Sequence, residues 1–485
     1  MGWLRRKSGC GLACGDEANR QWGFRMNASS DRLSRWTPVM FACALINLCL
    51  GLLLAVSGLA WPAAPAGAPL TLAMVHLLTI GWLTLLMFGA LFQFVPVITG
   101  RKLQSQALPL VTLIGLEVGL ALMVGGFCAL GRYAAAGVLL PAGGCLVIAA
   151  LIVGAGTLLV PLGAKRPVPL SARFVMAGLG FLLLTVLLGL TLALALTVPA
   201  AAPALAPLLA DGVSYHALAG LGGWFTLTAI GVSYELLPMF MLAPHERGTL
   251  GLAILWTGAA GFVAAFAAGL ATTVSPAGWI MGVEQAGRLA IVLAVALYLA
   301  DVVRLYRSRR RRQIELHNRA AIGAFVALGL AALLAIGAAP AGRLADLAPS
   351  LVLLVLLGWL SGLGLTQLYK IVAFLSWLSR YGGRLGRGAV PRVQDLVNEP
   401  GAVGFFVLYF AAVTLAAGAA ALGLADVVRG ALALALLAIL LLAREYARAW
   451  RATYAHEAAA GSHPVASPSL ARKESADDPG RSAHA

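Results

Sequence analysis

Charged residues are scarce in this chain: they make up 11% of its 485 residues, whereas soluble domains carry about a quarter. That scarcity excludes an ordinary soluble protein. The six cysteines do not form a disulfide framework, because four of them lie inside apolar runs, where we expect small core residues. A Cys-x-x-Cys-His sequence is also missing, which excludes a covalently attached c-type haem.

Long apolar runs are what the chain has in abundance. Hydrophobic residues make up 60% of it, in stretches long enough to cross a bilayer as helices. These stretches are too long for membrane β-strands and do not alternate, which excludes a β-barrel. The sequence therefore predicts an all-α membrane protein. Twelve transmembrane helices are predicted, over residues 38–60, 71–98, 107–131, 134–161, 171–198, 213–241, 250–272, 278–302, 318–339, 348–378, 401–424 and 427–448.

The chain divides into three parts. Residues 1–37 are predicted to be a basic N-terminal segment, 38–451 the membrane domain, and 452–485 a disordered tail. Lys and Arg gather in alternate loops, as in the run Arg309–Arg312. Positive loops face the cytoplasm, so both termini are predicted to be cytoplasmic, in a bacterial-type inner membrane. The net charge of +16 thus reflects topology, and we expect the lipid bilayer as a partner and no nucleic acid.

One motif recurs three times within the apolar runs. The copies are 142 and 135 residues apart (223 − 81 and 358 − 223) and start at Gly81-Trp82, Gly223-Trp224 and Gly358-Trp359. A hydroxyl residue stands two positions after each tryptophan, at Thr84, Thr226 and Ser361. This period predicts an internal repeat of a multi-helix unit. The alternative is chance recurrence of Gly-Trp pairs in membrane helices.

The copies fall on the second, sixth and tenth spans, which all run in the same direction. This predicts three parallel units of four helices, over residues 38–161, 171–302 and 318–448. We expect them to form three arcs in a pseudo-threefold arrangement about an axis along the membrane normal. The common transporter plan of two six-helix halves does not fit this period.

Histidines precede two of the three copies. His76 stands five residues before its Gly-Trp pair and His216 seven residues before. Both lie just inside the predicted outer ends of their spans, where ionisable residues usually face a site or a cavity. Because a two-residue offset rotates a helical side chain by about 200°, we expect the two histidines to address different inter-helix spaces. Neutral imidazole is a good ligand for haem iron and copper; the alternative is a histidine hydrogen-bonded between helices.

Twelve spans in three units, with His76 and His216 near the outer ends of spans 2 and 6, resemble subunit I of the haem–copper oxidase superfamily. The Gly-Trp…Pro pattern and the stretch Tyr234-Glu235-Leu-Leu-Pro238-Met-Phe are similar to its divergent members, including the NnrS-like haem proteins of nitrogen-oxide response. The resemblance covers residues 38–448. It implies an axial haem ligand at His76 and a copper-site ligand at His216.

The chain departs from the oxidase pattern at three places. Span 7, residues 250–272, lacks the expected histidine pair, span 10 lacks its two histidines, and Gly220 stands where the oxidases carry a tyrosine. A three-histidine copper site cannot be assembled, so we do not expect oxygen reduction, and copper is in doubt. One b-type haem remains the expected cofactor, with His76 on one side and His216, Met74 or no side chain on the other.

Three polar residues occupy one shared position of the repeat: Gln93, Glu235 and Lys370. If the axis is real, they lie at one depth near the cytoplasmic side of the three innermost helices. Glu235 and Lys370 would then offset each other's charge and form a structural polar centre. The alternative is a proton-conducting or gating role.

Other ionisable residues lie within the predicted spans. Glu284 and Arg288 are four residues apart on span 8, the spacing of an intrahelical ion pair. Arg288 is a candidate partner for haem propionates, as is Arg429 at the outer start of span 12; the alternative for Arg288 is a self-neutralised pair with Glu284. Glu117, near the middle of span 3, lacks an assignable partner and is a proton-relay candidate or a hydrogen-bonded structural residue.

These observations favour a haem-binding membrane protein with an oxidoreductase-like fold, acting in electron transfer, nitrogen-oxide or gas response, or haem and copper handling. For that function we expect an electron-transfer partner or an oxidase-like complex as a binding partner. The alternative is a cofactor-free transporter or scaffold built on the same helices. A third hypothesis is a subunit of a quinol-linked oxidoreductase.

Overall fold

The computed structural model describes residues 35–198, 200, 202–244, 248–273, 275, 277–385 and 390–461. Most of the predicted N-terminal segment 1–37 and most of the predicted tail 452–485 lie outside the described residues.

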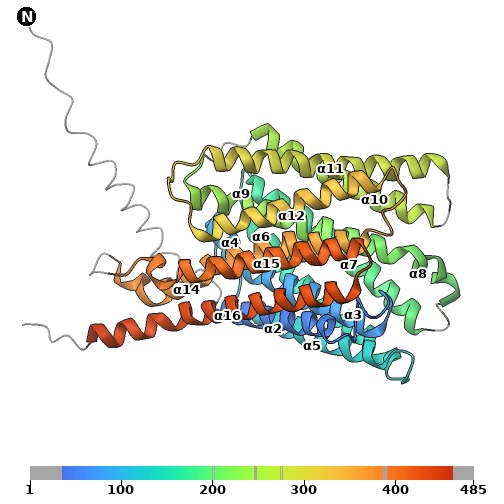
Figure 1. The fold of residues 1–485 in the computed structure, drawn as a ribbon, viewed down its shortest axis with the longest axis horizontal. Coiled ribbons are helices and arrows are strands. Elements are labelled where there is room, and N and C mark those ends of the chain that lie inside the picture. The colour runs from blue at the N-terminus through green and yellow to red at the C-terminus, as the bar shows by residue number, and fades with distance from the viewer. Residues whose placement is uncertain are drawn as a thin grey trace, which may run out of the picture.

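The described residues form helices and no strand, and twelve helices are long and apolar enough to cross a membrane. The all-α membrane fold is therefore confirmed. Figure 1 shows the helices side by side along the long axis of the molecule. The single-helix spans are α2 (Thr37–Val56), α5 (Ala107–Ala129), α6 (Ala136–Ala164), α7 (Leu170–Thr197), α10 (Gly248–Thr272), α11 (Gly278–Arg307), α12 (Leu316–Ala338), α15 (Glu399–Ala421) and α16 (Ala425–Gly461).

The second, sixth and tenth spans are each composite, with a π-helical segment between two α-helices. Their parts are α3 (Pro69–His76), η2 (Leu77–Thr84) and α4 (Leu85–Thr99); α8 (Ala202–Ala217), η3 (Leu218–Thr226) and α9 (Leu227–Met241); and α13 (Ala348–Val352), η4 (Leu353–Ser361) and α14 (Gly362–Tyr381).

Local sequence explains how such a span begins and ends. Pro69 is the first residue of α3, where its fixed φ suits a helix and its missing N–H is not needed. The span ends at Gly100, whose φ of 68° is the left-handed conformation common just after a helix. At the other end of the chain, α16 continues to Gly461, past the predicted boundary at 451, because the sequence there is rich in helix-forming alanine.

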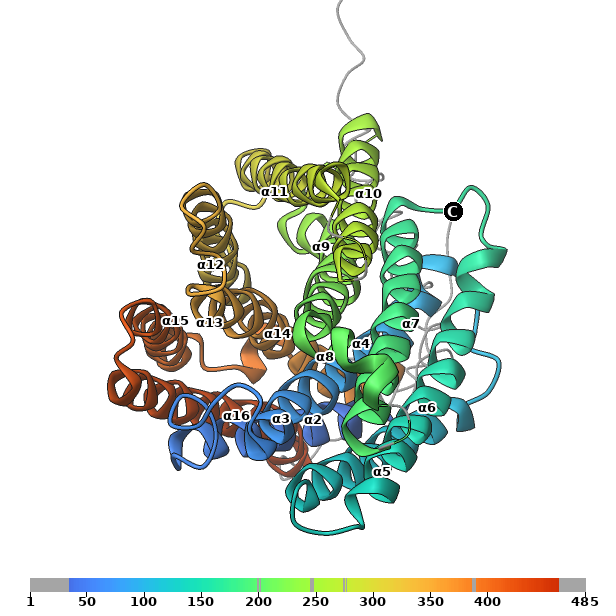
Figure 2. The same ribbon diagram turned by 90° about the vertical axis from the view of Figure 1, so that its right-hand side faces the viewer.

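The three composite spans are the buried ones. In their most apolar windows 67%, 72% and 78% of residues are buried, whereas the other nine spans range from 28% to 44%. Viewed end-on, α4, α8 and α14 lie toward the middle of the bundle, with α5, α6, α11, α12 and α15 at its edge (Figure 2). The Gly-Trp motif thus marks the helices that build the core, as the sequence predicts.

The π-helical segments coincide with the three copies of the motif. Long π-helical stretches are rare, so the same departure at the same position supports an internal repeat. The tryptophans are among the largest fully buried side chains, at 0% exposure for Trp82, 1% for Trp224 and 0% for Trp359. The pseudo-threefold arrangement of arcs stays a prediction.

The motif's small and hydroxyl residues have definite packing roles. An added Cβ at Gly81 would lie 2.6 Å from Asn47, and one at Gly358 would lie 2.6 Å from Ala327, so only glycine allows the helices to approach this closely. The Trp82 indole donates a 2.8 Å hydrogen bond to the Ser361 hydroxyl. This bond joins the first copy of the motif directly to the third.

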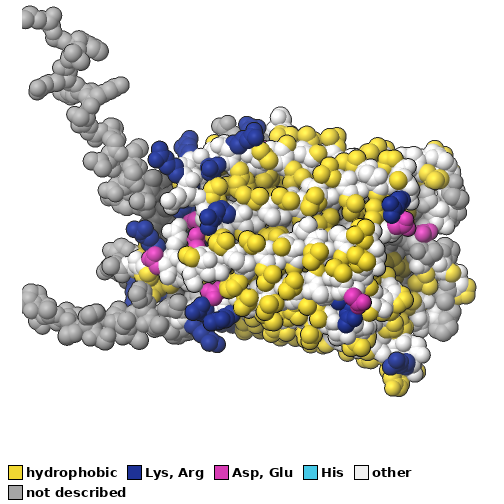
Figure 3. Space-filling view, viewed as in Figure 1, with side chains coloured by type: hydrophobic (Ala, Val, Ile, Leu, Met, Phe, Trp, Pro, Cys, Tyr) yellow, Lys and Arg dark blue, Asp and Glu magenta, His cyan; other side chains and the backbone are white. Residues whose placement is uncertain are grey.

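Lys and Arg side chains gather mainly at one end of the bundle in the face shown in Figure 3. We call this the basic end; it carries the loops after spans 2, 4, 6, 8 and 10, including Arg101 and Arg309. We call the other end of the bundle the opposite end. The basic end is the one predicted to be cytoplasmic, and the orientation itself stays a prediction.

Candidate functional site

The two predicted ligand histidines lie side by side toward the opposite end. His76 is the last residue of α3, and His216 is the last but one of α8, so each stands just before a π-helical segment. Their ring centroids are 6.5 Å apart, with 30° between the ring planes. The expectation that they address different spaces is wrong. The two histidines lie on helices that face each other. Side chains that point in different directions when the repeats are superposed can therefore meet between spans 2 and 6.

Backbone carbonyls hold both rings by the same nitrogen. Nδ1 of His76 lies 2.7 Å from the Leu72 carbonyl oxygen, and Nδ1 of His216 lies 3.0 Å from that of Thr185. A carbonyl oxygen only accepts, so Nδ1 must carry the proton in each ring. In a neutral imidazole this leaves Nε2 with a free lone pair, as in metal-binding histidines. Among the described residues, neither Nε2 has a hydrogen-bond partner.

Neighbouring residues fix where the rings lie. The His76 ring packs on Phe127 of α5, with centroids 5.0 Å apart. The His216 ring fills the space beside Gly189 of α7, where an added Cβ would lie 2.8 Å from Cε1. The two imidazoles are therefore placed by four helices, α3, α5, α7 and α8.

The donor set suits one metal centre held by two imidazoles. Two metal–nitrogen bonds of about 2 Å and two ring radii add to roughly 6 Å, close to the observed 6.5 Å separation of centroids. Within the described part of the chain, no three His, Cys, Asp or Glu side chains gather in a metal-binding group. The pair therefore offers two imidazole donors that could hold one metal centre.

A polar chain starts next to His216. The Tyr215 hydroxyl donates to Glu284 Oε1 over 3.3 Å, and Arg288 forms an ion pair with the same oxygen. The predicted Glu284–Arg288 pair is confirmed. Tyr215 was not singled out from the sequence, although its place directly before His216 was the available signal.

Arg429 lies at the start of α16 and contacts the first span. Its Nη2 donates to the Val56 carbonyl oxygen over 3.2 Å, and its Nη1 lies 3.4 Å from Asp426. A cation beside the last carbonyls of α2 stabilises that helix end. In the described structure neither Arg429 nor Arg288 contacts His76 or His216. Their assignment to haem propionates stays a prediction.

The three residues of the predicted polar centre have separate surroundings. Lys370 Nζ lies 2.6 Å from Glu315 Oε2, so the expected compensation of Glu235 by Lys370 is wrong. Glu235 instead accepts a 3.3 Å hydrogen bond from Ser171 and lines a cavity of about 320 Å³ between spans 5, 6 and 7. Gln93 lies on α4. A shared repeat position does not bring Glu235 and Lys370 together, because each contacts a different neighbour.

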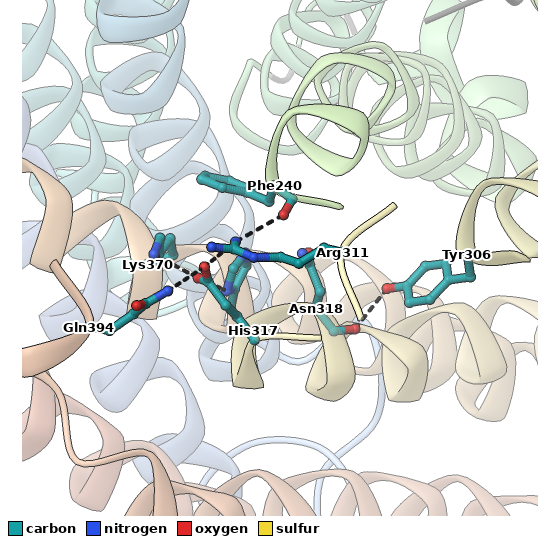
Figure 4. A network of polar contacts seen from close by, with 8 residues as sticks. Phe240, Tyr306, Arg311, His317, Asn318, Lys370 and Gln394 are labelled. Atoms are coloured by element: carbon teal, nitrogen blue, oxygen red, sulfur yellow. Dashed lines mark hydrogen bonds and ion pairs between the residues drawn. The ribbon is translucent and has the colours of Figure 1, made fainter. Parts of the chain in front are cut away.

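The partner of Lys370 is the centre of a larger network, shown in Figure 4. One carboxylate oxygen of Glu315 accepts from Gln394 over 2.8 Å and pairs with Arg311. The other meets Lys370, and lies 3.5 Å from Nδ1 of His317. Glu315 thus joins the loop before α12, the tenth span and the loop after it.

Arg311 carries this network to the end of the sixth span. Its Nη1 donates to the Phe240 carbonyl oxygen over 3.1 Å. Burial opposes ionisation of Glu315, but Lys370, His317 and Arg311 outweigh it and hold the pKa of this carboxyl below its ordinary value of 4.5. The network therefore connects the sixth and tenth spans and their adjoining loops through charged groups at the basic end.

Glu315 was not predicted from the sequence. The signal was the four-residue spacing of Arg311 and Glu315 immediately before an apolar run. Glu117 does have a partner, which was not foreseen: the Asn47 side chain donates to its Oε1 over 3.0 Å.

Comparison of the chain with protein-family models and with curated proteins finds no match.

Proposed function

We propose that this twelve-helix membrane protein binds haem, with His76 and His216 as the two axial ligands of one b-type haem iron. The observation that carries the proposal is the paired imidazoles, 6.5 Å apart, each tied through Nδ1 to a carbonyl so that Nε2 is available. The sequence resemblance to haem–copper oxidase subunit I supports the same assignment at His76.

The residues of the chain have defined tasks at this site. The Leu72 and Thr185 carbonyls set the tautomer and orientation of the two rings and make them better ligands. Phe127 covers one face of the His76 ring and keeps water from it. A haem iron held by both histidines would supply one-electron transfer.

This ligand set favours electron transfer, gas or nitrogen-oxide response, or haem and copper handling over oxygen reduction. Oxygen reduction in the similar superfamily relies on histidines of spans 7 and 10, and α10 and α14 contain none. We place the protein in a bacterial-type inner membrane with both termini cytoplasmic. An electron-transfer partner would then dock at the opposite end, near the histidine pair.

The visible spectrum of the protein purified from haem-replete cells tests this. We expect a Soret band typical of six-coordinate, low-spin haem, with one iron per chain. His76→Ala and His216→Ala should each abolish that low-spin spectrum. Phe127→Leu keeps an apolar side chain over the His76 ring and changes no ligand, so it is the matched control and should keep that spectrum.

Two results would contradict the proposal. A colourless protein would leave a cofactor-free transporter or scaffold as the better hypothesis. A colourless protein with one copper per chain, lost in both histidine variants, would assign the histidines to copper instead of haem.

A further inference from the structure

A second polar site lies near the middle of the membrane, in the first four-helix unit. Glu117 stands near the centre of α5 (Ala107–Ala129) and Asn47 near the centre of α2 (Thr37–Val56). Asn47 Nδ2 lies 3.0 Å from Glu117 Oε1 and 3.4 Å from the Gly81 carbonyl oxygen in η2. One amide therefore bridges a carboxyl group and a backbone carbonyl of the π-helical segment.

The side-chain surroundings of Glu117 are apolar. Asn47 is 6% exposed, so its amide is committed to these contacts. Glu117 itself is partly exposed on a helix face where Ile114 and Val118 are 53% and 46% exposed, the face that meets lipid. The Cys43 thiol lies beside the carboxyl group.

Among the described residues, no Lys or Arg forms an ion pair with Glu117. It is the only Asp, Glu, Lys or Arg among the four spans of this unit, α2, α3–η2–α4, α5 and α6. The other titratable side chains on these elements are Cys43, Cys49, Cys128, Cys145 and His76. An uncompensated carboxylate at this depth would cost several kcal/mol, whereas the protonated acid costs far less.

We propose that Glu117 is a proton-binding site within the membrane: its carboxyl group carries a proton, accepts the Asn47 amide at Oε1, and exchanges that proton as conditions change. The bound species is the proton, and no metal or organic ligand is required. Loss of the proton strengthens the Asn47–Glu117 hydrogen bond, because an ionised acceptor binds a donor more strongly.

The stronger Asn47–Glu117 hydrogen bond affects η2, the π-helical segment that follows His76. Asn47 Nδ2 also lies 3.4 Å from the Gly81 carbonyl oxygen. A stronger hydrogen bond from Asn47 to Glu117 therefore weakens the contact with Gly81. The link from Glu117 to the histidine pair rests on the proposed haem function. The proton site itself does not, since all three of its groups belong to the protein.

A hydrophobic carbodiimide tests the site in the wild-type protein. The reagent adds to a protonated carboxyl group in an apolar setting, and peptide mass analysis locates the adduct. We expect modification of Glu117 that slows as the pH rises, because the reagent needs the protonated acid. Glu284 is the matched control: Arg288 and the Tyr215 hydroxyl both contact its Oε1, so it should react at least about tenfold more slowly.

Infrared spectroscopy supplies a measurement that does not depend on reagent access. The wild-type spectrum should contain the carbonyl stretch of a protonated carboxylic acid, and Glu117→Gln should lose that band while keeping the fold, because glutamine mimics the neutral acid. In Asn47→Leu the band should persist to higher pH than in the wild type, since a donor that favours the charged form is gone.

Absence of both the band and the adduct at Glu117 would overturn the proposal. Equal labelling of Glu117 and Glu284 would also overturn it, because the reagent would then not be reporting a bound proton. Neither result bears on the haem spectrum, so failure of this site and failure of the haem proposal are distinguishable.

Discussion

The histidine pair and the Glu315 network are both polar groups within this apolar bundle, but they differ in how many of their polar atoms have partners. Glu315 has four side-chain partners, two of them cationic. The histidines carry no charge partner, and each uses one ring nitrogen while the other stays unbound within the described structure.

The difference separates a structural role from a binding role. A buried ion with all of its partners present is stable where it is, and removal of one partner leaves another charge uncompensated. A neutral imidazole with a free lone pair is tolerated at low cost and has capacity left for a ligand. We therefore expect changes at Glu315 to alter stability and changes at the histidines to alter binding.

The largest expected effect on stability is at Glu315. Glu315→Gln should lower the free energy of unfolding by about 3–5 kcal/mol, because Lys370 and Arg311 lose their shared counter-charge. Denaturant unfolding in detergent would measure it. Asp346→Asn is the control: it removes the partner of Arg343 at a site where the aspartate is 69% exposed, and it should change stability by no more than about 1 kcal/mol.

A double variant sharpens this prediction. Glu315→Gln combined with Lys370→Gln should recover part of the loss, since no unpaired ammonium group remains. Additive losses would show that the two side chains act independently, contrary to their 2.6 Å contact.

Acid should produce a smaller effect at the same residue. The folded-state pKa of Glu315 lies below the ordinary 4.5, so its stabilising contribution is complete above about pH 4.5 and is lost as the pH falls through the folded pKa. The stability difference between wild type and Glu315→Gln should therefore shrink below about pH 4. Unfolding measured from neutral to acidic pH checks this, and a constant difference would rule it out.

The smallest expected effect on stability is at the histidines. In protein prepared without haem, His76→Ala should cost only about 1 kcal/mol, because it removes the ring contact with Phe127 and one hydrogen bond. A loss as large as that at Glu315 would mean that the histidine is structural and would erase the contrast between the two regions.

Some of this arrangement was accessible from the sequence. The apolar runs predicted all twelve spans, and the Gly-Trp motif identified the three buried ones, because membrane thickness and close helix packing impose simple patterns on a chain. The Glu284–Arg288 pair followed from helical spacing alone. The π-helical backbone at each Gly-Trp copy was not foreseen, since no local propensity marks it.

The partners of side chains on different helices were decided by tertiary structure. The sequence by itself determined that His76 and His216 lie at similar depth and that Lys370 lies inside a span. Only the packing of the spans brought the two rings together. The same packing pairs Lys370 with Glu315 rather than with Glu235. The physical reason is that depth follows from position along one helix, whereas contact depends on the rotation and crossing of two helices.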